Sequence, residues 1–188
     1  MQLMSAERAC NPHARAILEF WFRGDTERKE WFRKDPSFDE DIRSRFRSLY
    51  EEAASGALPS WLDSPRDCLA LIVLLDQFPR NMFRDSARAF ATDARALDAA
   101  RHAVASGYDR ALSDIERTFI YLPFEHSENL ADQERALELF AGHSNREWAR
   151  RHWEIVKRFG RFPHRNAVLG RQSTPAEIEF LKQPRSSF

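Results

Sequence analysis

Three short blocks hold most of the residues in this chain that could do chemistry. The first is Leu75–Asn81, and the third, Phe159–Asn166, repeats its Phe-Pro, Arg and Asn with one residue more between Pro and Arg. Between them lies Tyr121–Glu128, which carries Glu, His, Ser and Glu in succession. Guanidinium groups bind carboxylate or phosphate bidentately, and imidazole and carboxyl groups act as general acids and bases. The blocks therefore predict an anion site or acid–base chemistry.

Because each block follows an apolar helical pattern and contains Pro, we expect all three to be loops at helix ends. If these ends meet, the polar side chains share one partly desolvated place, where pKa values shift and charge-assisted hydrogen bonds strengthen. We predict that Asp76, Arg80, His126, His164 and Arg165 converge there. The candidate ligand-binding residues are Asp76, Arg80, Asn81, His126, Arg161, His164, Arg165, Asn166 and Arg171.

Several functions fit these residues. In a site for a small anionic ligand, arginines clamp the anion while imidazole and amide groups orient it. In a hydrolase-like enzyme the catalytic candidates are His126 or His164 as base or acid, with Glu125 or Glu128 as the orienting carboxylate. The residues assigned to the anion site are Arg80, Arg161 and Arg165 as the clamp and His126, His164 and Asn166 as the orienting groups.

Two other readings need no small ligand. In a structural network, Arg and Asn just after Phe-Pro satisfy the open carbonyls of the helix ends, and Asp76 or Glu125 neutralises the arginine charge. In a peptide-binding scaffold, stacked helical pairs form a groove. The gathering of polar residues in three blocks, rather than along helix faces, favours a localised site over such a groove.

The motifs of cofactor and metal enzymes are missing from the sequence. His126, Glu128 and His164 could supply three metal ligands, but neither His-Glu-x-x-His nor paired-Cys spacing occurs. Ser127 lacks the glycines of a nucleophile elbow, and no Gly-rich loop suited to a phosphate or a dinucleotide is present. We therefore expect neither a metal nor a cofactor.

The elements that must position the blocks are helices. Apolar residues recur at helical spacing, and the glycines fall where each pattern runs out. No stretch alternates with period two, so we expect no sheet, and seven or eight amphipathic helices stacked as antiparallel pairs. The predicted starts are Asn11-Pro12, Asp35-Pro36 (with a Ser37–Glu40 capping box), Ser64-Pro65, Ala87, the Ser113–Glu116 capping box, Leu130, Asn145 and Thr174-Pro175.

The composition fits one globular domain over residues 1–188. Hydrophobic residues make up 43% and charged residues 31%, and the formal net charge is zero. This balance argues against a nucleic-acid partner. The apolar run Cys68–Leu75 is too short to span a bilayer, and residues 1–15 lack the apolar core of a signal peptide. Two cysteines without a redox or metal spacing agree with a reduced, cytoplasmic setting. The oligomeric state is left open.

The three blocks, together with Trp21-Phe22, Trp31-Phe32 and Thr174-Pro175, resemble the characteristic segments of a bacterial family of uncharacterised proteins, the domain of unknown function numbered 924. The resemblance covers essentially the whole chain. It implies an all-helical fold similar to that of tetratricopeptide-repeat proteins, and it implies no activity.

Overall fold

The computed structural model describes residues 10–24, 28–31 and 33–187, and all regular structure in these ranges is helical. The predicted all-helical class is confirmed. Since α3, η3 and α4 are continuous, α1 to α9 amount to eight α-helices in the described ranges, within the expected number. The elements are α1 Pro12–Trp21, η1 Lys29–Trp31, α2 Pro36–Ser55, η2 Pro59–Asp63, α3 Pro65–Ile72, η3 Val73–Gln77, α4 Phe78–Met82, η4 Ala87–Phe90, α5 Asp93–Ala105, η5 Tyr108–Ala111, α6 Asp114–His126, α7 Leu130–Leu139, α8 Arg146–Phe159, η6 Pro163–Arg165 and α9 Pro175–Leu181.

Most predicted helix starts are correct, because caps act within one turn. The Asn11 side chain accepts the His13 N–H, and the Ser113 and Thr174 capping boxes are both present. The Ser37–Glu40 capping box is wrong. Asp35 is the N-cap instead, and its carboxylate accepts the N–H groups of the second and third helical residues.

The prediction that the third helix ends at Phe78-Pro79 is wrong. The chain passes through one π-helical segment, η3, and continues as α4. Pro79 has no N–H to offer to the Leu75 carbonyl, and the Thr92 hydroxyl donates to that carbonyl at 2.6 Å instead. The Arg80 guanidinium likewise donates to the Asp76 carbonyl. Side chains thus replace the backbone bonds that Pro79 disturbs, and the helix survives.

Two further expectations need correction. The helix predicted to start at Ala87 is instead a 3-10 turn, η4, followed after Thr92 by α5. The helix that was expected to stop near Pro123 includes it, since α6 runs on to His126. As a result the first block and the second block up to His126 lie within helices rather than in loops, whereas Ser127 and Glu128 and most of the third block follow helix ends.

The core is rich in aromatic rings. Phe20 stacks on Phe38 with ring centroids 5.4 Å apart, and Trp21 packs at 5.5 Å from Phe78. Cys68, the first residue of the apolar run, is fully buried. Trp148 of α8, by contrast, is 51% exposed. Within the described ranges, no helix combines the length and apolarity needed to cross a membrane.

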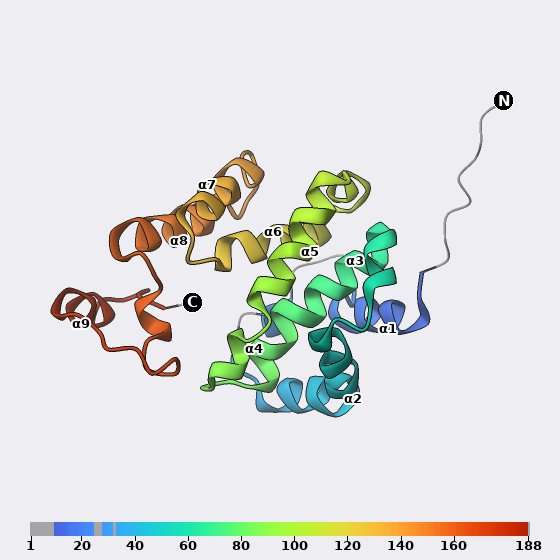
Figure 1. The fold of residues 1–188 in the computed structure, drawn as a ribbon, viewed down its shortest axis with the longest axis horizontal. Helices are drawn as coiled ribbons and strands as arrows, with labels where there is room; N and C mark the ends of the chain where they lie inside the picture. The colour runs from blue at the N-terminus through green and yellow to red at the C-terminus, as the bar shows by residue number, and fades with distance from the viewer. Residues whose placement is uncertain (1–9, 25–27, 32, 188) are drawn as a thin grey trace.

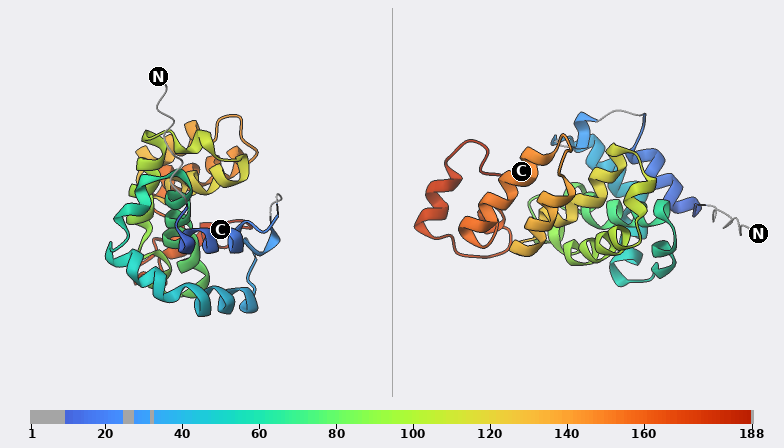
Figure 2. Two further views of the ribbon diagram at one scale, coloured as in Figure 1. Left: turned by 90° about the vertical axis from the view of Figure 1, so that its right-hand side faces the viewer. Right: turned by 90° about the horizontal axis from the view of Figure 1, so that it is seen from above.

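Neighbouring helices follow one another through the molecule, with α1 against α3, α3 against α5, α5 against α6, α6 against α7, and α7 against α8. Figure 1 shows α1 and α2 on one side, α8 and α9 on the other, and α5 and α6 between them. The right-hand view of Figure 2 shows the same order from above, with α9 at the end away from α1. This arrangement brings η3, α4, α5, the end of α6 and η6 to one junction.

Candidate functional site

Two arginines from different blocks meet at one carboxylate. Arg80 donates to both oxygens of Asp93, at 2.9 and 3.1 Å, and Arg165 donates to Asp93 Oδ2 at 3.1 Å. Both guanidiniums also lie over the ring of Phe90, at 5.5 and 4.5 Å from its centroid. Carboxylate and ring together hold two positive charges side by side.

Asp76 and His126 complete the group. Asp76 is fully buried, and its Oδ1 lies 2.8 Å from His126 Nδ1 and 3.3 Å from Arg80 Nη1. An ionised carboxylate only accepts hydrogen bonds, so Nδ1 carries the imidazole proton and Nε2 is left as the acceptor. Arg165 Nη2 donates to the His126 carbonyl at 3.1 Å. We call Asp76, Arg80, Asp93, His126 and Arg165 the arginine–aspartate cluster.

Local structure explains these positions. Asp76 lies in η3 and Arg80 one turn later in α4, so both face the start of α5. His126 is in the last turn of α6. Gly160, at a φ of 70°, ends α8 in the left-handed region and lets the chain turn into η6, which carries Arg165. Each member of the cluster thus comes from a helix or a helical turn.

Burial governs the electrostatics. Desolvation, reinforced by the charge of Arg80, lowers the pKa of Arg165 to about 10. Desolvation, with the nearby Arg165 charge, lowers the pKa of His164 to about 3. Burial opposes the ionisation of Asp76, but Arg80 and His126 outweigh it and hold its pKa below the ordinary value. Asp76 is therefore an anion and His164 is neutral at pH 7.

A second set of contacts borders the cluster. Arg171 makes a bidentate pair with Glu128 at 2.6 and 2.9 Å, and Glu128 also accepts the Phe162 N–H at 2.7 Å. Glu125, 2% exposed, lies 2.7 Å from His152 Nδ1. Both glutamates are therefore engaged with partners other than His126. Within the described ranges, no group of three or more His, Cys, Asp or Glu side chains is placed to hold a metal ion.

The structure thus brings together four of the five residues expected to converge: Asp76, Arg80, His126 and Arg165. The fifth, His164, lies beside the cluster, with its ring 5.6 Å from that of Phe162.

Three candidates lie elsewhere. Asn81 donates to Asp39 at 2.8 Å. Arg161 pairs with Glu177 at 2.6 and 2.8 Å. Asn166 donates to the Ser173 hydroxyl at 3.0 Å. Helical geometry points Asn81 away from its neighbour Arg80, because adjacent helical residues do not share a face.

Sequence reasoning missed Asp93, Phe90 and His152. Asp93 is the first residue of α5, directly after Thr92, in a segment read as the middle of a longer helix. The one available signal was the Thr-Asp pair, which is typical of a helix start. His152 is buried on α8 with Ile155, within the stretch that was interpreted only as a helix starting at Asn145.

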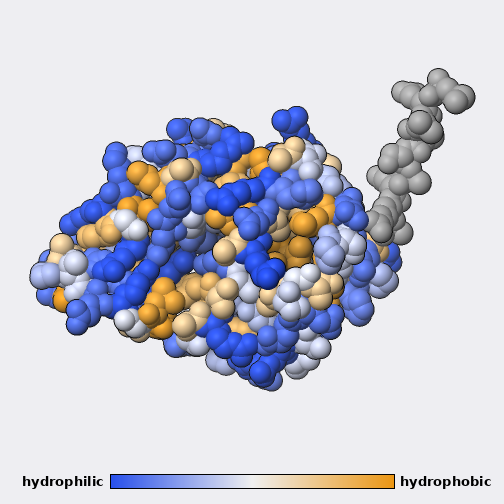
Figure 3. Space-filling view, viewed as in Figure 1, coloured by the Kyte–Doolittle hydropathy of each residue, from blue (hydrophilic) through white to orange (hydrophobic). Residues whose placement is uncertain are grey.

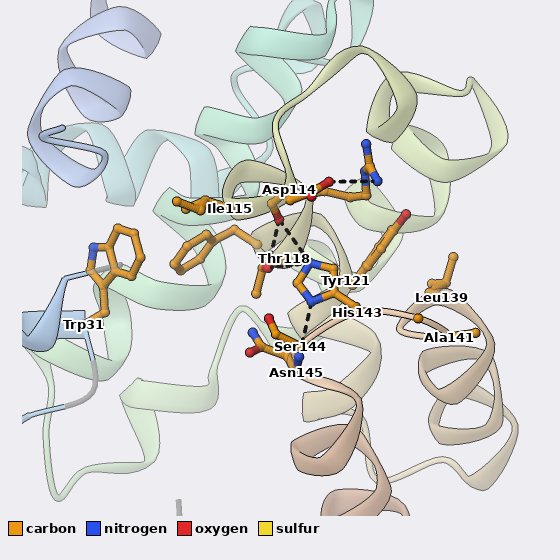
Figure 4. Close-up of a pocket in the computed structure, with 13 residues that line it drawn as sticks. Trp31, Asp114, Ile115, Thr118, Tyr121, Leu139, Ala141, His143, Ser144 and Asn145 are labelled. Carbon is orange, nitrogen blue, oxygen red and sulfur yellow. Dashed lines mark hydrogen bonds and ion pairs between the residues drawn. The ribbon is translucent and has the colours of Figure 1, made fainter. Parts of the chain in front are cut away.

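A separate cavity of about 440 Å³ lies away from the cluster (Figure 4). It opens between α6 and the loop joining α7 to α8, with Trp31 and Thr118 in its wall. His143 Nδ1 accepts the Asn145 N–H at 3.3 Å, and its Nε2 lies 3.2 Å from the Asp114 carbonyl. Nε2 thus links the loop to α6, while Nδ1 bonds to the backbone of the loop itself, so both ring nitrogens of His143 have structural partners.

The members of the cluster differ in exposure. In Figure 3 hydrophilic side chains cover most of the visible face of the molecule, and smaller apolar patches interrupt them. At the cluster, the side chains of Arg80 and Asp93 are each 20% exposed and that of His126 is 15% exposed, whereas Asp76 is closed off. The cluster therefore has an outer edge and a buried floor.

The fold and the site define an all-helical protein with a partly buried arginine–aspartate cluster. A family model described as a bacterial protein of unknown function, DUF924, matches residues 17–185, and the chain belongs to this family. It is similar to a solved structure of a protein of unknown function from Agrobacterium tumefaciens, with 43% identity, 90% of this chain and 97% of that chain covered, and a TM-score of 0.86. No curated protein matches.

Proposed function

We propose that the protein binds a small anionic molecule at Arg80 and Arg165. One observation carries the proposal: two guanidiniums converge on a single carboxylate, and the Nε of Arg165 is buried without a hydrogen-bond partner among the described residues. A buried N–H that lacks an acceptor is costly, by about 1–3 kcal/mol. An incoming oxyanion supplies the acceptor that the cluster lacks.

The outer edge gives such an anion its approach. Arg80, Asp93 and His126 are the partly exposed members, so a carboxylate or phosphate oxygen arriving there first meets the guanidinium of Arg80. Nε2 is the ring nitrogen of His126 on the side away from Asp76. The fully buried Asp76 stays the fixed counter-charge beneath both groups.

A thermal-shift series tests the proposal with acetate and inorganic phosphate as probes. At 100 times Kd a ligand adds about 2.7 kcal/mol to stability, which raises the Tm of a chain of this size by roughly 5–10 °C. The wild type is expected to shift and Arg165→Met is not. Arg84→Ala is the matched control, since Arg84 is also held bidentately by an aspartate, Asp39, outside the cluster. A shift that survives Arg165→Met would remove the proposal.

A second candidate is a hydrolase-like enzyme. It is favoured by the Asp76–His126 pair, in which a buried carboxylate fixes the imidazole tautomer as an acid–base dyad requires. Asp76 takes the orienting role that we had assigned to Glu125 or Glu128. In a screen of anionic esters, His126→Asn is expected to abolish turnover while Tm changes little. A large drop in Tm would assign His126 a structural role instead.

The peptide-scaffold alternative gains no support, because the unusual polar residues gather at one junction rather than along a groove. We also infer one domain over residues 1–188, since α3, α5, α6 and α7 contribute to one continuous core. A cytoplasmic location is part of the same proposal, in keeping with the free cysteines Cys10 and Cys68.

A further inference from the structure

The charges of the arginine–aspartate cluster balance before any ligand arrives. Arg80 and Arg165 contribute two positive charges, and Asp76 and Asp93 two negative ones. The floor of the cluster is buried, with Asp76 at 0% and Arg165 at 7% exposed. A monoanion bound here adds one negative charge with no counter-charge, and uncompensated charge in a desolvated place is expensive.

His126 is the group able to supply the missing positive charge. Its Nδ1–H is fixed by Asp76, so the ring can gain a proton only at Nε2, the nitrogen that faces away from the carboxylate. Its position in the last turn of α6 favours the charged form, because the C-terminal end of a helix attracts cations. Burial and the charge of Arg80 hold its pKa below the ordinary value while no anion is bound.

Each element packed around His126 contributes a charged or titratable neighbour. Asp76 and Asp93 favour the imidazolium, whereas Arg80 disfavours it. The His152 ring has its centroid 6.3 Å away. These neighbours are Glu125 from α6, Asp76 from η3, Arg80 from α4, Asp93 from α5, His152 from α8 and Arg165 from η6.

We propose that the site binds a small monoanion of the carboxylate class together with one proton, which His126 Nε2 accepts. The inference rests on the proposed function and deepens it. A monoanion plus a proton leaves the buried charge at zero, whereas a dianion such as phosphate at pH 8 leaves one negative charge uncompensated. In the bound state the oxyanion accepts from the guanidiniums and from the histidinium N–H, all charge-assisted bonds.

The proton link fixes the sign of the pH dependence. The anion raises the pKa of His126, so the affinity is greatest below the pKa of the free site. It falls about tenfold per pH unit between the free and bound pKa values, and it levels off above the bound value. Acetate binding is therefore expected to weaken from pH 6 to pH 8.

Calorimetry on the full chain tests the proposal, with acetate titrated in imidazole and in Tris buffers. Their charged forms are cations that do not compete for the site, and their ionisation enthalpies differ. The expected result is uptake of up to one proton per acetate. An NMR titration of the His126 imidazole is expected to give a higher pKa with acetate than without it. His126→Gln, whose amide can still donate to Asp76, is expected to bind acetate without proton uptake, and Arg84→Ala is expected to behave as wild type.

The outcomes separate the two proposals. Acetate binding with equal heats in both buffers and a flat pH profile would overturn the proton link and leave the anion site standing. Failure of the wild type to bind acetate or phosphate would overturn both. If His126→Gln does not fold, the wild-type NMR titration decides alone, because an acetate-independent pKa of His126 contradicts the proposal.

Discussion

The two Phe-Pro elements share a sequence order but not a backbone. Phe78-Pro79 lies inside a continuous helix, where η3 and two side-chain bonds absorb the missing N–H. Phe162-Pro163 follows a helix that has already ended at Gly160, and it leads into the 3-10 turn η6. The same order of residues is therefore part of a continuous helix at Phe78-Pro79 and part of a turn at Phe162-Pro163.

Despite this difference, the arginines of both elements reach the same partners. Arg80 and Arg165 both bond to Asp93 and both lie over Phe90. The two asparagines have different partners, since Asn81 bonds to Asp39 and Asn166 to Ser173. A long guanidinium side chain can converge on a charge from different backbones, whereas a short amide stays with its local surroundings.

The largest effect is expected from removing the shared partner. Asp93→Ala leaves two adjacent guanidiniums in a partly buried place, and we expect a loss of about 3–5 kcal/mol in the free energy of unfolding, measured with urea. Asp98→Ala is the control, because Asp98 lies on the same helix and is 75% exposed in its pair with Arg101. It should cost less than about 1 kcal/mol. A loss of similar size in both variants would show that Asp93 does not unite the two elements.

His164 is the residue that the second element has and the first lacks. Its pKa, lowered to about 3 chiefly by burial and then by Arg165, lies below that of the unfolded chain. The unfolded state therefore binds the proton first, so the stabilisation is complete above about pH 6.5 and is lost as the pH falls toward 3. His164→Gln should reduce the slope of the free energy of unfolding against pH between pH 6.5 and 4, by up to about 1.4 kcal/mol per pH unit.

The control for this slope is His13→Gln, at an exposed position of α1. Urea unfolding at four pH values measures all three proteins. Equal slopes for His164→Gln and wild type would place the acid sensitivity elsewhere in the chain.

The continuation of the helix past Pro79 depends on the Thr92 hydroxyl. Thr92→Val removes the hydroxyl that bonds to the buried Leu75 carbonyl, and we expect a loss of about 1–3 kcal/mol. In a Pro79→Ala background the restored N–H at position 79 can reach that carbonyl, so the same substitution should cost less. A double-mutant cycle by urea unfolding measures the difference. Equal costs in both backgrounds would contradict the compensation.

The turn at the second element depends on Gly160, and replacing this glycine is expected to cause the smallest loss of stability. At a φ of 70° an added Cβ meets nothing within 4 Å, so the cost of Gly160→Ala is conformational alone, about 1 kcal/mol. Gly160→Asn should cost less, because Asn tolerates the left-handed region better than Ala. Thermal unfolding compares the two. An equal cost would indicate that packing, rather than φ, sets the penalty.

Helix boundaries and class could be predicted because their causes are local. Asn11, Ser113 and Thr174 bond to N–H groups two or three residues away, and the apolar period is visible within a single helix. The same locality explains the errors. Asp35, not Ser37, caps one helix start. The helix predicted to stop at Pro79 continues because Thr92 bonds to the Leu75 carbonyl, which lies 17 residues earlier in the chain.

The sequence by itself determined an all-helical protein and marked the residue types of the three blocks, including Asp76, Arg80, His126 and Arg165. Only the tertiary structure decided that Asp93 unites the arginines, that Asp76 orients His126, and that Arg161 and Asn81 belong elsewhere. The reason is distance along the chain: Asp93 and Arg165 are 72 residues apart. Many carboxylates are available to a guanidinium in an unfolded chain, and helix packing selects one of them.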